Sequence, residues 1–194
     1  MGVYKRTAGS RSAIHALRKA RAALANATPQ RLDCGELCGR ACCLACGNGE
    51  NGMLLWPFEA QFYSSAIDGF PFLLKPDDTL YAGGSRLVCE GTCPREHRPL
   101  SCRMFPLRLS AMADDKGMIT SAAIEIDPRA WALCPLPEKG GLGAMDKAFM
   151  AAMEKAGQAM FGSAHLLKAL LREQRMIDAM RRFPNQNAEQ EGEH

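Results

Sequence analysis

Apolar residues at helical spacing mark the N-terminal part of the chain. Leu17 and Leu24 fall on one face of a helix that this spacing predicts over residues 10–27. Thr28-Pro29 ends the helix, because a residue that precedes proline disfavours the helical conformation. Residues 1–32 carry seven Lys or Arg and no Asp or Glu, which we interpret as a basic helix with a solvated face. An organellar transit peptide has the same composition, and that alternative stays open.

The C-terminal part is predicted to form two helices. Helical spacing of apolar residues runs through residues 144–182 and breaks at Gly162-Ser163, where Ser163 can act as the N-cap of the second helix. Phe183-Pro184 stops that helix, and the polar tail 185–194 is predicted to be disordered. One face of the first helix is interpreted as core packing; it carries Met145, Phe149, Met153 and Met160.

Residues 70–127 are predicted to be rich in β-structure. Turn residues separate the apolar runs, and Asp77-Asp78 and Asp114-Asp115 are interpreted as turn residues rather than as paired catalytic carboxylates. A short helix over residues 58–67, with Pro57 in its first turn, is predicted before this region. The predicted extended segments are 72–74, 79–81 and 86–88, together with 107–112 and 118–126, which form a hairpin.

The composition is that of an ordinary globular chain. With 194 residues, 47% hydrophobic and 23% charged, the sequence excludes general disorder and collagen-like structure. A formal net charge of +3 is too small to indicate nucleic-acid binding by itself. No apolar run approaches the roughly 20 residues that cross a bilayer, so no membrane span is predicted. Residues 1–30 contain no secretory signal pattern, which predicts a reducing, cytoplasmic location.

Nine cysteines are the unusual feature, and five of them lie between Cys34 and Cys46. In a reducing compartment, clustered cysteines hold metal more often than they form disulfides. Cys42 and Cys43 are adjacent, and such neighbours rarely bridge each other without strain. Glycines argue against regular structure over residues 33–53, and a loop lets backbone N–H groups turn toward thiolate sulfurs. The cysteines therefore predict a metal site.

Arginines lie in or beside the cysteine segments. Four thiolates around a divalent ion leave a net charge of about −2, which cations or N–H groups must offset. We expect the guanidinium groups of Arg98 and Arg103, which flank Cys102, to hydrogen-bond sulfur. The alternative for Arg103 is a pair with a carboxylate such as Glu59 or Asp127. The arginines that either offset thiolate charge or form a solvated face are Arg40, Arg86, Arg95, Arg98, Arg103 and Arg108.

Three stretches together resemble a known family. They are Cys34-Gly-Glu-Leu-Cys38-Gly-Arg-Ala-Cys42-Cys43, then Gly52-Met-Leu-Leu-Trp-Pro57-Phe-Glu59, then Cys93 with Arg98-Pro99-Leu-Ser-Cys102-Arg103-Met-Phe105-Pro106-Leu107. Over residues 33–136 the chain resembles the YkgJ-like cysteine-cluster family, which is described as a zinc- or iron-chelating domain and has flagellin N-methylases among its distant relatives. Two departures are the first cysteine spacing, of three residues, and the additional Cys46. The metal ligands that the resemblance implies are Cys34, Cys38, Cys42, Cys43, Cys89, Cys93, Cys102 and Cys134.

Eight such cysteines admit two four-thiolate sites or one cluster with spare ligands. Zinc ions and iron–sulfur clusters are both compatible with this number of ligands. We favour iron–sulfur because zinc sites normally show regularly spaced pairs of cysteines. His97, four residues after Cys93, is a candidate nitrogen ligand, although a surface histidine that hydrogen-bonds backbone is the more ordinary interpretation. The sequence assigns no role to Cys46.

The sequence thus predicts an α+β fold, in which flanking helices enclose a small cysteine-rich metal-binding core with short β-hairpins. The predicted function is metal binding with a structural or redox role. The alternatives are a metal-dependent, methyltransferase-like protein-modifying enzyme and a zinc module that binds nucleic acid through the basic N-terminal helix; the missing base-reading helix weighs against the latter. Enzymatic activity, protein partner, substrate and oligomeric state stay open. The predicted segments are the basic helix 1–32, the cysteine-cluster domain 33–136, the C-terminal helices 137–184 and the tail 185–194.

Overall fold

The computed structural model describes residues 8–31, 34–44, 52–89 and 93–182. Its fold is α+β, as predicted. Within these residues, no helix combines the length and the apolar character that crossing a membrane requires. The predictions for residues 185–194 and for Cys46 lie outside the described residues.

The α-helices are α1 (Ala8–Ala23), α2 (Cys34–Leu37), α3 (Ala41–Leu44), α4 (Leu100–Met104), α5 (Lys147–Phe161) and α6 (Ala164–Arg182). The strands are β1 (Met53–Leu54), β2 (Phe72–Pro76), β3 (Ser85–Cys89), β4 (Leu107–Ala113) and β5 (Ile119–Ile126). The 3-10 helices are η1 (Glu59–Tyr63), η2 (Arg95–His97), η3 (Pro128–Ala130) and η4 (Gly141–Ala144).

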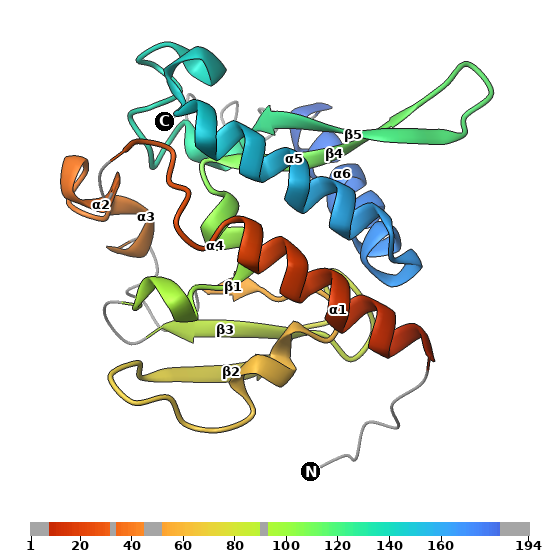
Figure 1. Ribbon diagram of the computed structural model, residues 1–194, viewed down its shortest axis with the longest axis horizontal. Coiled ribbons are helices and arrows are strands. Elements are labelled where there is room, and N and C mark those ends of the chain that lie inside the picture. Colours follow the sequence, from red (N-terminus) through yellow and green to blue (C-terminus); the bar gives the residue numbers. More distant parts are fainter. Residues whose placement is uncertain (1–7, 32–33, 45–51, 90–92, 183–194) are drawn as a thin grey trace, which may run out of the picture.

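Two small antiparallel sheets lie on opposite sides of α1 and α4 (Figure 1). In the three-stranded sheet the order is β1-β3-β2, and Leu87 of β3 is paired with Met53 of β1 and with Leu74 of β2. In the hairpin, Leu109 of β4 is paired with Ile124 of β5. The turn end of this hairpin extends well beyond the helices in Figure 1.

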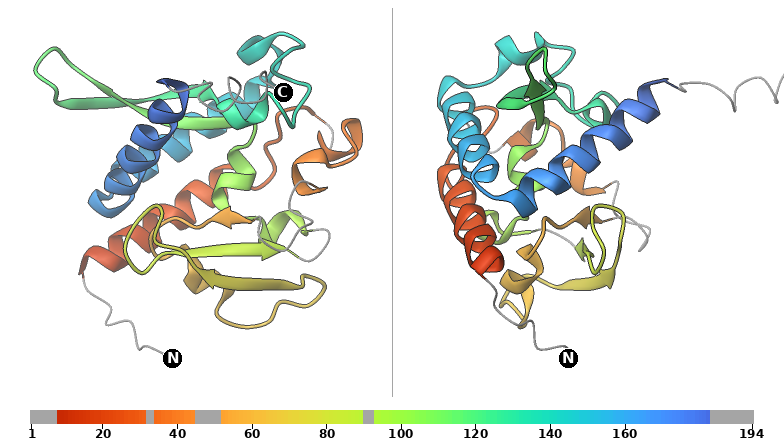
Figure 2. Two further views of the ribbon diagram at one scale, coloured as in Figure 1. Left: turned by 180° about the vertical axis from the view of Figure 1, so that it is seen from behind. Right: turned by 90° about the vertical axis from the view of Figure 1, so that its right-hand side faces the viewer.

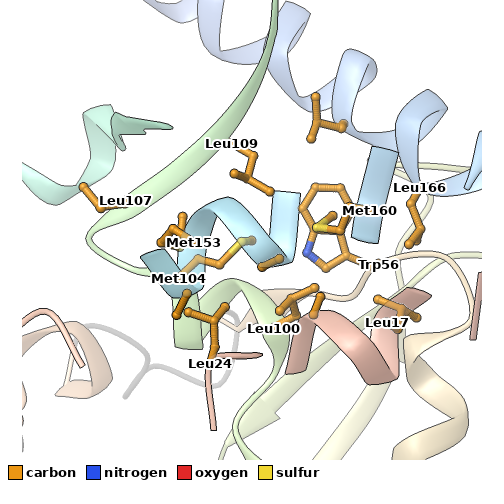
Figure 3. Packing of buried hydrophobic residues seen from close by; sticks show 14 of the residues in the cluster. Leu17, Leu24, Trp56, Leu100, Met104, Leu107, Leu109, Met153, Met160 and Leu166 are labelled. Carbon is orange, nitrogen blue, oxygen red and sulfur yellow. The ribbon is translucent and has the colours of Figure 1, made fainter. Parts of the chain in front are cut away.

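The larger hydrophobic core lies between α1, α4, α5, α6 and the hairpin. Figure 3 shows Trp56 at its centre, near Leu100 of α4 and Met160 of α5. Each of these three side chains is at most 1% exposed. Helix α1 packs along α5 and α6, as the two views of Figure 2 also show. The predicted core face of the first C-terminal helix is confirmed, since the structure buries Met145, Phe149, Met153 and Met160.

A smaller hydrophobic cluster lies on the three-stranded sheet. Cys89 and Cys93 pack against it, whereas Cys134 packs against the larger core. Cysteine-bearing segments are therefore anchored in both cores. The buried members of the smaller cluster are Leu55, Tyr63, Phe70 and Leu87.

Several predicted elements are confirmed. The C-terminal helices α5 and α6 meet at Gly162-Ser163, and strands occupy the segments predicted at 72–74 and 86–88. The predicted hairpin is present as β4 and β5. Asp114 is a turn residue, because its Oδ1 accepts hydrogen bonds from the N–H groups of Lys116 (3.0 Å) and Met118 (2.9 Å).

Two elements differ from their prediction. Residues 79–81 are not a strand, because the Asp77 N–H donates to the Gly84 carbonyl at 3.0 Å and closes the loop between β2 and β3. The helix predicted over residues 58–67 is reduced to the single 3-10 turn η1. Phe58 has a left-handed conformation with φ of 69°, which prevents the helix from starting there.

The cysteine segment and the α5–α6 junction also differ from their prediction. Residues 33–53 were predicted to lack regular structure, but they contain the one-turn helices α2 and α3. Gly39 and Arg40 separate these helices with φ values of 58° and 60°, so neither helix extends beyond one turn. Ser163 occupies the predicted N-cap position of α6, since its carbonyl accepts from the Leu167 N–H at 2.9 Å, but its hydroxyl is buried and forms no capping hydrogen bond with the described residues.

Candidate metal centre

Five cysteine side chains from four separate segments line one cavity of about 60 Å³. Cys38 follows α2, α3 carries Cys42 and Cys43, α4 carries Cys102, and Cys134 follows η3. Cys43 is exposed and the other four are half-buried. Figure 1 shows α2, α3 and the teal segment that contains η3 gathered on the left of the molecule, and the rear view in Figure 2 shows the same grouping. Cysteines far apart in the sequence thus meet at one place.

The turn between α2 and α3 places the first cysteines at this cavity. Two consecutive left-handed residues, Gly39 and Arg40, reverse the chain. The Arg40 N–H donates to the Gly35 carbonyl at 2.9 Å, and the Cys43 N–H donates to the Arg40 carbonyl at 2.7 Å. These bonds close a compact loop, so Cys38 and Cys43 line the same hollow.

Buried hydrogen bonds fix the start of α4, which carries Cys102. Glu59 is fully buried, and its Oε1 accepts from the N–H of Leu100 at 2.7 Å. Its Oε2 accepts from the N–H of Trp56 at 3.1 Å. The Trp56 indole N–H in turn donates to Ser101 Oγ at 3.0 Å. The segment that carries Trp56 and Glu59 therefore sets the position of α4 and of its cysteine.

An ion-pair network positions Cys134. The Cys134 N–H donates to the Ala130 carbonyl at 2.8 Å, which continues the turn of η3. Asp127 caps η3 by accepting from the Arg129 N–H at 2.9 Å. The Arg129 guanidinium pairs with Asp127 at 2.5 Å and with Glu173 of α6 at 3.1 Å. Helix α6 thereby helps to hold the segment that delivers Cys134 to the cavity.

Cys89 and Cys93 form a thiol pair beside the cavity. Their mutual hydrogen bond lowers the pKa of Cys89 and, with burial, raises the pKa of Cys93. The Cys93 thiol also donates to the Pro94 carbonyl at 3.5 Å. The charge of Cys43 opposes the lowering of the Cys89 pKa, and that of Cys102 adds to the rise of the Cys93 pKa, so this pair lies within electrostatic range of the cavity cysteines.

The cavity cysteines also shift one another's pKa. A hydrogen bond to Cys43 raises the pKa of Cys42, and burial and the charges of Cys43, Cys102 and Cys38 raise it further. Burial raises the pKa of Cys134, and Cys38 adds to that rise. Ligation of a metal by Cys42 and Cys134 would therefore have to displace their thiol protons.

Two of the six arginines singled out from the sequence, Arg40 and Arg98, line the cavity. Lys139 joins them there, although sequence analysis did not identify it. No Asp or Glu occurs among the described residues that line this cavity. Arg98 Nε donates to the Cys93 carbonyl at 3.4 Å. The other four have partners elsewhere: Arg86 pairs with Asp77, Arg108 pairs with Glu125, and Arg95 and Arg103 donate to backbone carbonyls.

Arg103 is built into the backbone framework. It is 5% exposed, and each of its three guanidinium nitrogens donates to a backbone carbonyl. The carboxylates considered as its partners, Glu59 and Asp127, pair with other arginines. Of the two arginines expected to hydrogen-bond sulfur, Arg98 and Arg103, only Arg98 therefore lies in the cavity lining. The carbonyls that Arg103 contacts belong to Arg98, Arg21 and Glu96, at 2.9, 3.2 and 2.7 Å.

The remaining candidates are placed as follows. His97 stacks on Phe70 with ring centroids 6.2 Å apart, and its carbonyl accepts from the Tyr63 hydroxyl at 2.8 Å. Cys34 begins α2, but its side chain and all of Cys46 lie outside the description. Within the described part of the chain, no three His, Cys, Asp or Glu side chains are grouped to hold a single metal ion. The cysteines line a hollow instead of converging on one point.

Fold and site together define a small α+β protein with a cysteine-lined, cation-rimmed cavity. In comparisons with known proteins, no family model, no curated protein and no solved structure matches the chain. The resemblance to the YkgJ-like family therefore stays a prediction, and the function has to be argued from the site.

Proposed function

We propose that this protein binds a metal centre through cysteine thiolates, with a structural or redox role. One observation carries the proposal: five cysteines from four segments line one cavity, together with Arg40, Arg98 and Lys139 and without a carboxylate among the described lining residues. Thiolates are the ligands that soft metals and iron–sulfur clusters prefer. An intracellular location, which the sequence predicts, keeps such thiols available to metal.

The size of the hollow favours an iron–sulfur cluster over a single zinc ion. Four sulfurs at 2.3 Å from a tetrahedral zinc ion lie roughly 3.8 Å from each other, so they must converge on a point. A cluster that contains several iron and sulfide atoms needs ligands spread around a larger space. The cavity of about 60 Å³ is several times the roughly 10–15 Å³ that one water-sized sphere needs. Its lining therefore suits a group of several atoms.

The charges around the cavity suit a thiolate centre. Four thiolates with a divalent ion, or with a cluster core of the same charge, carry a net charge of about −2. Arg40, Arg98 and Lys139 supply three positive charges that offset it. When bound, the metal centre would supply either cross-linking of the segments or one-electron chemistry.

The proposed ligands come from two groups. The cavity group comprises Cys38, Cys42, Cys43, Cys102 and Cys134, and the adjacent pair comprises Cys89 and Cys93. Cys34 is added on the family resemblance alone. These are more cysteines than one four-ligand centre uses, so the proposal includes either a second site or spare ligands.

Anaerobic purification followed by iron, zinc and sulfide analysis tests the proposal. An iron–sulfur centre gives brown protein with broad absorption near roughly 400 nm, whereas zinc gives colourless protein. Cys102→Ser should lose metal and lower the melting temperature, because metal binding contributes to folding. Cys46→Ser is the matched control, since Cys46 falls outside the family pattern.

Three outcomes would overturn the proposal or its ligand set. Well-folded protein that contains no metal after anaerobic preparation would refute metal binding. Equal metal loss from Cys46→Ser and Cys102→Ser would show that the ligand set is wrong. A co-purified methyl donor, or salt-dependent retention on DNA, would favour the enzyme or the nucleic-acid module instead.

A further inference from the structure

We infer that the mouth of the cysteine-lined cavity binds a small organic carboxylate. The inference rests on the proposed function, because the metal centre is assigned to the cysteines of the same cavity. Arg40 and Lys139 line the cavity and are exposed, as Cys43 is, and Arg98 is half-buried, so cations contribute to the solvent-facing part of the lining.

These cations have no anionic partner in the part of the chain that the structure describes. Ion pairs to carboxylates engage Arg21, Arg31, Arg86, Arg108, Arg129 and Arg181, but none engages Arg40, Arg98 or Lys139. No carboxylate lines the cavity among the described residues. A four-thiolate centre with a net charge of about −2 leaves about one of the three positive charges uncompensated. A singly charged anion would balance the site.

The backbone at Arg40 is a second, independent observation. Its φ of 60° lies in the left-handed region, which is disfavoured for a residue with a side chain. The preceding residue, Gly39, adopts the same conformation without that penalty. A glycine at position 40 would fit the turn better, so the turn alone does not account for an arginine. Disfavoured backbone conformations of this kind cluster at ligand-binding and active sites.

The rest of the lining selects the kind of anion. Phe105, Leu133 and Leu136, with two prolines, contribute an apolar wall to the same cavity. An oxyanion head would contact the guanidinium groups, and a planar carboxylate matches the fork of Arg98. A short apolar body would lie on the wall and bury its methylene groups.

Ligand-observed NMR titration of the metal-loaded protein with acetate, butyrate and inorganic phosphate tests this inference. Butyrate should bind more tightly than acetate, by up to about fourfold for each methylene that reaches the wall. Phosphate, which has no apolar body, should bind no better than acetate. Added sodium chloride should weaken all binding, because exposed charges are screened by salt.

Arg40→Gly and Lys139→Gln should each weaken butyrate binding about three- to fivefold, and the double variant about tenfold. Lys155→Gln on α5 is the control, because Lys155 is exposed and does not line the cavity. Arg40→Gly should keep or raise the melting temperature, since glycine adopts the left-handed conformation without strain. This result would separate binding from folding.

The outcomes distinguish the two proposals. Metal-loaded protein that binds none of the three anions saturably, or a double variant that binds butyrate as tightly as the parent, would refute the carboxylate site and leave the metal centre standing. Tighter binding of phosphate than of butyrate would refute the organic ligand. Metal-free protein would refute the proposed function, whatever the anion titration gives.

Discussion

Glu59 is the buried carboxylate whose replacement should be most costly. Its Oε1 accepts from the Leu100 N–H (2.7 Å) and from the Arg21 guanidinium (3.0 Å), and its Oε2 accepts from the Trp56 N–H (3.1 Å). Burial raises the pKa of the Glu59 carboxyl, and Arg21 and the two amides oppose this rise. Three N–H donors point at its two oxygens, and a carboxylate accepts all of them. We therefore treat it as ionised.

Glu59→Gln keeps the size of the side chain but replaces one acceptor oxygen with an NH₂ donor. At least one N–H donor then faces another donor, and the Arg21 side chain, 13% exposed, loses its counter-charge. Removing one partner of a buried ion pair costs about 3–5 kcal/mol. For a chain of this length about 2–4 °C of melting temperature accompanies each kcal/mol, so we expect a drop of about 6–20 °C.

Thermal and urea unfolding of Glu59→Gln, with Glu154→Gln as control, measures this cost. Glu154 is exposed on α5, so its replacement should change the unfolding free energy by at most about 0.5 kcal/mol. A double-mutant cycle with Arg21→Gln isolates the pair, and the double variant should lose clearly less than the sum of the single losses. A loss below about 1 kcal/mol for Glu59→Gln, or additive losses in the cycle, would refute the reasoning.

Two further predictions concern the framework around the site. Arg103→Ala should lower the melting temperature, because three backbone carbonyls lose a charged hydrogen-bond donor. The metal content per folded chain should stay unchanged. A parallel loss of metal would show that Arg103 contributes to the metal centre. Asp146 caps α5 by accepting from Ala148 N–H at 2.8 Å, and this bond, with Arg31, lowers its pKa below 3.8. Because its folded pKa is the lower one, Asp146 stabilises the fold above pH 3.8, and this contribution disappears as pH falls through the folded pKa. The melting-temperature gap between parent and Asp146→Ala should thus be full at pH 7 and shrink as the pH falls below about 4; a constant gap would contradict the assignment.

The parts of the fold that followed from the sequence are those with local signals. Apolar periodicity and the break at Gly162-Ser163 were sufficient for α5 and α6, and two alternating runs around Asp114 were sufficient for the β4–β5 hairpin. The extended segment at 79–81 was misassigned, because its apolar composition is also that of a loop closed by backbone bonds between Asp77 and Gly84. Local composition does not distinguish these two cases.

The roles of the arginines could not be predicted, since their partners are distant in sequence. Arg95 donates to the Ala25 carbonyl at 2.8 Å and also to the carbonyls of Leu24 and Ala27, beyond the last turn of α1. Cations are favourable near the end of a helix, where carbonyls lack helical partners. Arg103 similarly donates hydrogen bonds to a carbonyl of η2 and to one of α1. Proximity to cysteines in the sequence therefore suggested sulfur contacts where the structure has backbone contacts.

The clustering of the cysteines has a physical cause that links folding to the proposed metal. Two hydrogen bonds attach Pro29 and Gln30, which follow α1, to the region of η4 and the start of α5. The Asp146 N–H donates to the Pro29 carbonyl at 2.9 Å, and the Gln30 amide donates to the Ala144 carbonyl at 2.8 Å. This segment leads to α2 and α3, and Cys38, Cys42 and Cys43 of this region line the cavity. Cys134 packs against the larger core, and Cys89 and Cys93 pack against the smaller one. A centre ligated from both groups would join the cores, so its binding free energy would add to the stability of the whole fold rather than to one loop.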